Sequence, residues 1–172
     1  MSTHINKLCS TAFFYLHNIQ GIRKYFDQKS VLTLLLAFIT SRRDYCNSLL
    51  YGLPNTEISK LQRVNNAAAR TVTFSSKFSH VTPVLCELHW LPVRFRISFK
   101  MLLIVFKSLL GQTPQYISNL ISVRNRSAYQ MWSNDGLLLD FPRGKMLTSF
   151  GDRSYPVAAP TLWNALPTSL RK

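Results

Sequence analysis

Acidic residues are scarce in this chain of 172 residues. Seven Asp and Glu stand against 21 Lys and Arg, so the formal net charge is +14. The acids are scattered along the chain, whereas nucleases and polymerases need clustered carboxylates to hold two catalytic metal ions. The sequence therefore argues against polymerase or nuclease chemistry and against any carboxylate-rich metal site.

Cysteines, glycine-rich loops and long apolar runs are also in short supply. Three cysteines at wide spacings give no disulfide framework, which indicates a reducing intracellular compartment, either nucleus or cytoplasm. The six glycines are scattered, so no phosphate-binding glycine loop is present. The longest apolar stretch, Val31–Ile39, is far shorter than the ~20 residues that a membrane-spanning helix needs. The first fourteen residues lack a basic region followed by a long apolar run, so we expect no signal peptide there.

One short segment brings His and Cys residues together. His80, Cys86 and His89 lie within ten residues, but zinc sites usually need four ligands in two close pairs, and no second pair is present. A Cys86–His89 nucleophile pair lacks an orienting acid other than the neighbouring Glu87. Ordinary packing is the better interpretation, so we expect no metal, no cofactor and no catalytic residue.

With catalytic and metal motifs excluded, the main remaining feature is a net positive charge on a largely apolar chain. The chain is 47% hydrophobic and 12% aromatic, too apolar for a disordered protein. Its length predicts one domain, or one domain with an appendage. A sequence pI of about 10.2 favours a polyanionic partner, either nucleic acid or an anionic membrane surface.

Helical periodicity places the charge on particular faces. A helix is expected over 57–73, with Leu61, Val64, Ala68 and Val72 on one face. The opposite face is basic, and it is either a solvated surface or a phosphate-contacting one. A second helix over 93–110 is apolar in nearly all directions except for one basic stripe, which predicts a core helix closed by Gly111. The basic residues of the two helices are Lys60, Arg63, Arg70, Arg96, Lys100 and Lys107.

Further helices are expected over 4–28 and 31–40, the latter buried because it is apolar nearly all round. After residue 122 the sequence becomes polar and loses its helical periodicity. The segments 137–141 and 145–150 flank a Pro-Arg-Gly turn, which predicts a short β-hairpin. The predicted fold is mainly α, a helical bundle-like module over 1–122. A C-terminal hairpin and a short helix, together 123–172, would pack on it.

Six short motifs follow one another along the chain: Ser48–Pro54, Lys60–Arg70, His80–Leu85, Leu88–Arg94, Gly151–Tyr155 and Ala158–Pro167. Each motif alone is modest, but in this order the set resembles the C-terminal region, after the polymerase core, of jockey-like non-LTR retrotransposon reverse transcriptases. The resemblance covers nearly the whole chain.

The resemblance implies a thumb and tail that grip a template–primer duplex while other parts of the polyprotein perform the chemistry. The family's Tyr-x-Asp-Asp catalytic motif lies upstream of the matching region and is absent from this sequence. We therefore expect a non-enzymatic fragment of a longer frame, with Met1 inside that frame. The expected partners are an RNA or RNA–DNA duplex and, if present, the upstream polymerase core. The six basic residues named above would make sequence-independent phosphate contacts.

Two alternatives remain open at the level of sequence. The chain could be an inert truncated fragment whose apolar helices have lost the polymerase core that covered them. It could instead be a membrane-surface or helix-binding protein that uses its basic amphipathic helices.

Overall fold

The computed structural model describes residues 1–76, 78–124, 137–142 and 151–171. The described chain is mainly helical, as the sequence predicts, and it divides into two compact units, Met1–Ile97 and Ser98–Lys172. The boundary lies inside a helix, whereas the sequence places its boundary at residue 122.

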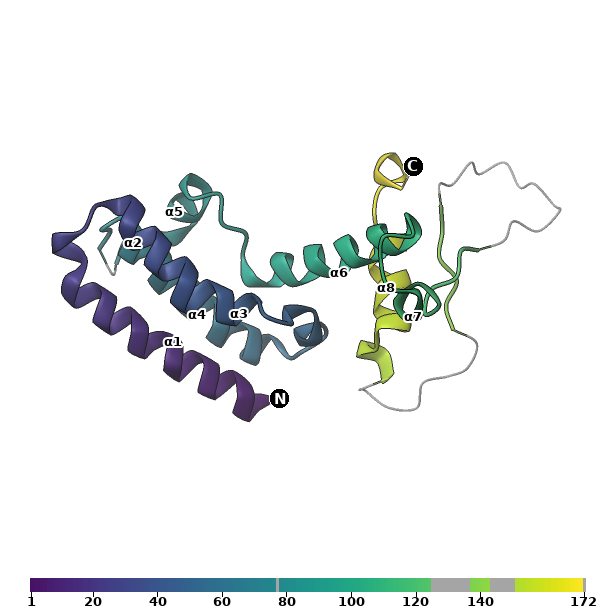
Figure 1. Ribbon diagram of the computed structural model, residues 1–172, viewed down its shortest axis with the longest axis horizontal. Helices are drawn as coiled ribbons and strands as arrows, with labels where there is room; N and C mark the ends of the chain where they lie inside the picture. Colours follow the sequence, from purple (N-terminus) through teal and green to yellow (C-terminus); the bar gives the residue numbers. More distant parts are fainter. Residues whose placement is uncertain (77, 125–136, 143–150, 172) are drawn as a thin grey trace. The chain divides into compact units, whose positions relative to one another are not determined.

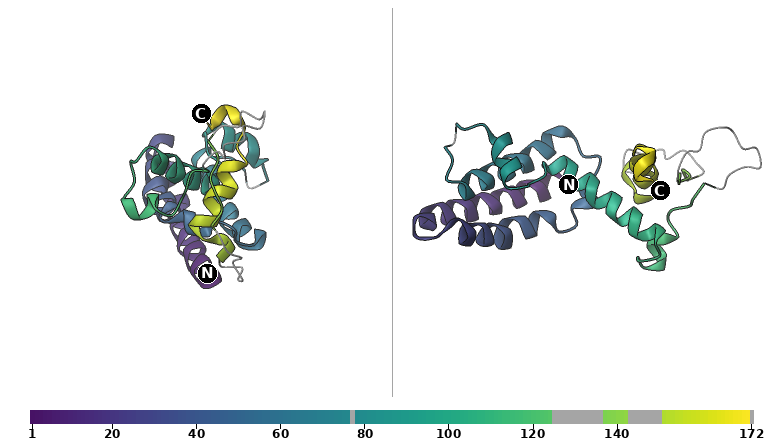
Figure 2. Two further views of the ribbon diagram at one scale, coloured as in Figure 1. Left: turned by 90° about the vertical axis from the view of Figure 1, so that its right-hand side faces the viewer. Right: turned by 90° about the horizontal axis from the view of Figure 1, so that it is seen from above.

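The first unit is built on three helices that lie side by side (Figures 1 and 2). They are α1 (Ser2–Ile22), α2 (Gln28–Leu35) and α4 (Asn55–Val72). The expected helix over 4–28 is interrupted after Ile22 by a 3-10 turn, Arg23–Tyr25, before α2 begins. The predicted apolar face of α4 is confirmed, because Leu61, Val64, Ala68 and Val72 are all buried. Buried side chains of α1 and α2 complete this core: Ile5, Cys9, Ala12, Leu16, Ile19, Val31 and Leu35.

The chain from α2 to α4 stays helical for most of its length. A π-helical turn, Leu36–Thr40, joins α2 to α3 (Ser41–Asp44), and a 3-10 turn, Asn47–Leu50, follows. Gly52 has a φ of +71°, a conformation that favours glycine, and it lies where this helical stretch ends.

The expectation that residues 31–40 are buried all round is wrong. One face is buried, but Leu36 and Phe38 are each 42% exposed. Val31, Leu35 and Ile39 are the buried residues of this segment that join the core with α1 and α4.

The helices α5 (Val81–Glu87) and α6 (Val93–Leu109) complete the helical pattern expected for this region. The predicted role of Gly111 is confirmed: it has a φ of +68°, and Gln112 N donates to Lys107 O at 2.9 Å. This left-handed residue with its backbone bond closes α6 in the usual way. The expectation that α6 is a core helix is only partly right, since Phe99, Phe106 and Leu110 are between 46% and 56% exposed.

The second unit has a small core around α8 (Tyr155–Asn164). Val105, Leu139, Ala159 and Trp163 are buried together there. Short helical turns surround this core: α7 (Gln115–Ser118), Gly151–Arg153 and Thr168–Leu170.

The predicted C-terminal hairpin is not found among the described residues. Its first arm, 137–141, forms no strand and makes a single antiparallel bridge, from Leu139 to Val123. Its second arm, 145–150, lies outside the residues that the structure describes.

The first arm has other partners for its backbone, which is why it needs no hairpin. Asn164 on α8 both accepts from Leu139 N (3.0 Å) and donates to Leu139 O (2.9 Å), and Trp163 Nε1 donates to Leu137 O at 2.8 Å. On the other side, Arg124 N donates to Leu138 O and Asp140 N donates to Ser122 O, both at 2.9 Å. Backbone polar groups are thus satisfied by a helix and a loop.

The three cysteines differ in accessibility, which gives a testable prediction. Burial raises the pKa of the Cys9 thiol above its ordinary value, and the thiolate is the reactive form. We expect iodoacetamide at pH 8 to modify the exposed Cys46 and Cys86 while Cys9 stays largely unmodified, and the rate at Cys9 to rise only at more alkaline pH. Peptide mass spectrometry measures this, with the urea-unfolded chain as the control in which all three react alike. Equal rates at Cys9 and Cys46 in the native chain would contradict the burial of Cys9.

Candidate nucleic-acid interface

Two side-chain contacts hold α1 parallel to α4. Near their first turns, Lys60 Nζ donates to Asn6 Oδ1 at 2.9 Å. Near their last turns, Gln20 Nε2 donates to Thr71 Oγ1 at 3.0 Å. One contact joins the early turns of the two helices and the other joins their late turns. The two helices therefore run in the same direction and are tied together near both ends.

A basic groove of about 730 Å³ lies between these two helices. Three arginines line it, Arg23, Arg63 and Arg70, and none of the described residues that line it is Asp or Glu. Its floor includes the buried side chains of Leu16 and Thr71. The complete lining is Phe13, Leu16, His17, Gln20, Arg23, Arg63, Asn66, Ala67, Arg70, Thr71 and Ser75.

The arginines of the basic groove differ in how firmly they are held. Arg70 donates from Nε (3.4 Å) and Nη2 (3.0 Å) to the carbonyl oxygen of Ser79, which fixes its guanidinium without neutralising it. The guanidinium of Arg23 lies over the ring of Phe74, 5.2 Å from the centroid. Arg63 is exposed. A guanidinium presents planar N–H donors that match phosphate oxygens, so the groove can bind an anionic phosphate chain.

Lys60 was predicted as a phosphate contact, but its charge is already paired. Its ammonium lies 3.0 Å from Glu57 Oε1 and 3.2 Å from Glu57 Oε2, in addition to its bond with Asn6. Lys60 therefore joins α1 to α4, and it does not line the groove.

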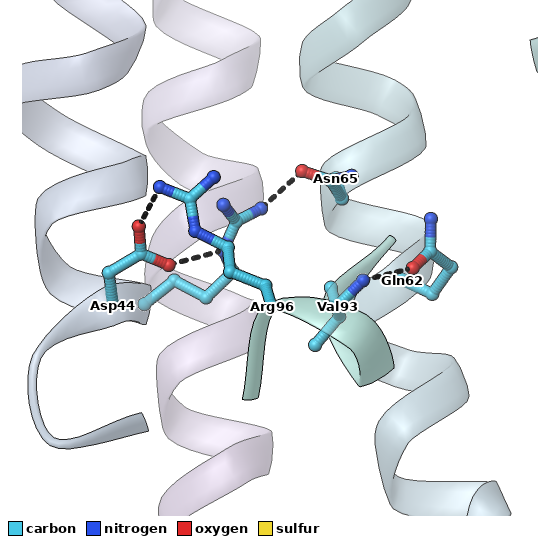
Figure 3. Close-up of polar contacts among 6 residues, drawn as sticks. Asp44, Gln62, Asn65, Val93 and Arg96 are labelled. Atoms are coloured by element: carbon cyan, nitrogen blue, oxygen red, sulfur yellow. Dashed lines mark hydrogen bonds and ion pairs between the residues drawn. The ribbon is translucent and has the colours of Figure 1, made fainter. Parts of the chain in front are cut away.

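Arg96 is also paired, and Figure 3 shows its contact with Asp44. The other carboxylate oxygen of Asp44 accepts from Arg43 Nε at 3.3 Å. Arg43 is only 3% exposed, and its guanidinium also donates to Asn65 Oδ1 on α4. Burial lowers the pKa of Arg43, and the Asp44 carboxylate opposes that shift. Arg96, whose side chain is 33% exposed, is therefore part of an ion network around the buried Arg43 that ties the start of α6 to α3.

The same corner satisfies the first backbone N–H of α6. Gln62 Oε1 accepts from Val93 N at 2.8 Å (Figure 3). Helix starts leave such N–H groups without an intrahelical partner, and here a side chain of α4 supplies the acceptor. Gln62 and the Asp44 network therefore fix where α6 begins.

The last two predicted contacts, Lys100 and Lys107, belong to the second unit. Both are exposed on α6 and make no ion pair within the part of the chain that the structure describes. They are available to an anionic partner. Of the six predicted residues, the structure thus brings only Arg63 and Arg70 together in one groove.

Three polar or charged groove residues on the α1 side, His17, Gln20 and Arg23, are absent from the sequence prediction. They come within reach of α4 only because the two helices pack together, and the side-chain bonds between these helices join residues 51 and 54 positions apart in the chain. One signal was available: Phe13, His17 and Gln20 recur at positions i, i+4 and i+7, which places them on one helical face.

Other kinds of site find no support among the described residues. They contain no group of three His, Cys, Asp or Glu that could hold a metal ion. No described helix is long and apolar enough to cross a membrane.

Comparisons of the chain with models of protein families, with curated proteins and with solved structures return no match.

Proposed function

We propose that this chain binds nucleic acid through the phosphate backbone, as a non-enzymatic thumb-and-tail region from a jockey-like non-LTR retrotransposon reverse transcriptase. The observation that carries the binding proposal is the basic groove, where Arg23, Arg63 and Arg70 converge without a nearby lining carboxylate. The ordered motifs of the sequence support the origin. In this proposal the upstream polymerase core of the longer frame supplies the catalysis.

Electrostatics supports a polyanion as the partner. The chain carries +14 in formal charge, and contacts that neutralise phosphates release condensed counterions. Binding of this kind carries little sequence information. It weakens as salt is raised, roughly in proportion to the number of phosphates contacted.

The proposal predicts a specific change in salt dependence. Replacing both Arg63 and Arg70 by Ala should weaken binding to an RNA–DNA duplex and lower the slope of log K against log salt by about two. Fluorescence anisotropy with a labelled duplex, measured between about 50 and 200 mM salt, gives both quantities.

A variant that removes the same charge elsewhere is the control. Lys29 and Arg94 are exposed and lie outside the groove lining, so Lys29→Ala with Arg94→Ala should change the slope by much less. Equal effects of the two double variants would show that only net charge matters. Absence of binding by the unmodified chain at low salt would reject the proposal and favour the inert fragment.

A further inference from the structure

We propose that the basic groove takes an unpaired strand of nucleic acid, with its phosphates on the arginines and its bases stacked on Phe13 in the groove lining and on Phe74 beside it. This inference rests on the proposed function and assigns a substrate class to the same groove. The form of the groove, the exposed rings and the backbone of Phe74 support it.

The form of the groove follows from helix packing. The axes of packed helices lie about 8–10 Å apart, so their side chains meet and leave a furrow on the surface above the contact. The two side-chain bonds described above hold α1 and α4 in such contact, and Leu16 and Thr71 line the furrow between them. A single strand can follow such a furrow with its backbone and turn its bases toward neighbouring side chains, whereas a duplex reaches the arginines with only one of its two backbones.

The arginines lie along the direction that a strand would follow. Arg63 and Arg70 are seven residues apart on α4, which is about 10 Å along the helix axis. Arg23, in the turn that follows α1, lines the same groove. Arg63 and Arg70 are thus spaced along the groove and can contact different phosphates of one backbone.

Two exposed aromatic rings accompany these arginines. Phe13 lines the groove and is 45% exposed, and Phe74, which is adjacent in the chain to the lining residue Ser75, is 46% exposed. Phe74 lies under Arg23. Unpaired bases stack on such rings, whereas the bases of a duplex are already stacked on one another. The combination of cations and rings therefore favours single strands.

The backbone at Phe74 adds a second reason. Its φ is +54°, and Ser75 N donates to Arg70 O at 3.1 Å, so Phe74 holds the position after a helix where glycine is usual. A side chain there costs stability. Strained residues of this kind cluster at ligand sites, and the ring that the strain presents is exposed beside the groove.

The same feature supplies a variant that removes the ring without harming the fold. Phe74→Gly keeps the left-handed backbone and relieves its strain. Together with Phe13→Ala it should weaken the binding of a single-stranded RNA oligonucleotide by about tenfold or more. Binding of the RNA–DNA duplex of the same sequence should change by less than about twofold.

The control is another ring under a cation. The ammonium of Lys24 lies 4.9 Å from the ring centroid of Tyr25, which is 74% exposed. Neither Lys24 nor Tyr25 lines the groove, whereas the Arg23 that lies over Phe74 does. Tyr25→Ala should leave binding to both oligonucleotides unchanged. Phe74→Trp should keep single-strand binding near the unmodified level, and urea midpoints check that every variant folds.

The outcomes separate this inference from the proposed function. Single-strand binding that is insensitive to Phe13→Ala with Phe74→Gly, or duplex binding that falls equally, would overturn the inference and leave phosphate binding intact. Failure of the chain to bind either oligonucleotide would overturn both. Displacement of the RNA by poly-glutamate at equal charge concentration would also overturn the single-strand inference, since an acidic peptide would then be the better occupant of the groove.

Discussion

Replacement of Asp44 by Ala is expected to lower the free energy of unfolding of the Met1–Ile97 unit by about 3–5 kcal/mol. The Asp44 carboxylate is the acid partner of both Arg43 and Arg96. Arg43 is 3% exposed, so its charge would remain buried without a counter-ion. Hydrogen exchange detects the loss as reduced amide protection in α3, α4 and the first turn of α6.

The matched control removes an ion pair that lies in solvent. Asp140 pairs with Arg124 at 2.9 Å, and both side chains are about half exposed, so Asp140→Ala should cost no more than about 1 kcal/mol. A second control replaces the whole network: Arg43→Met, Asp44→Leu and Arg96→Met together should recover most of the stability lost in Asp44→Ala. Similar costs for Asp44→Ala and Asp140→Ala would contradict a stabilising role for the buried network.

Replacement of Trp163 by Ala is expected to cost the second unit about 3–5 kcal/mol, the usual range for a buried tryptophan. Trp163 is 4% exposed and belongs to a core with only three other buried side chains among the described residues. Its indole N–H also donates to Leu137 O, so the change leaves a cavity and an unpaired carbonyl. We expect residues of α8 and 137–140 to lose hydrogen-exchange protection together, while α1 and α4 keep theirs.

Two other substitutions separate the causes of this loss. Trp163→Phe keeps an aromatic ring but removes the N–H donor, so it should cost less than Trp163→Ala. Leu170→Ala removes a side chain that is 65% exposed and should change stability by less than about 0.5 kcal/mol. A loss from Trp163→Ala no larger than that from Leu170→Ala would show that Trp163 does not hold this core together.

Local sequence patterns predicted most of the helices. The 3.6-residue periodicity over 57–73 identified the buried face of α4, and Gly111 marked the end of α6. These features depend on residues within a few turns of one another, so they are readable without tertiary structure. The hairpin prediction was not supported because the backbone of Leu137 and Leu139 is hydrogen-bonded to side chains of α8. These partners are distant in the chain, so no local sequence pattern could predict them.

Some properties of the candidate site were likewise readable from the sequence, and others depended on the tertiary structure. The sequence by itself determined the excess of positive charge, the basic face of α4 that carries Arg63 and Arg70, and the shortage of clustered acids. Only the tertiary structure decided which charges are free. It paired Lys60 with Glu57 and Arg96 with Asp44, and it brought Arg23 to the groove beside Arg70. The physical reason is that the free charge of a side chain depends on partners within a few ångströms, and packing brings those partners together across the chain.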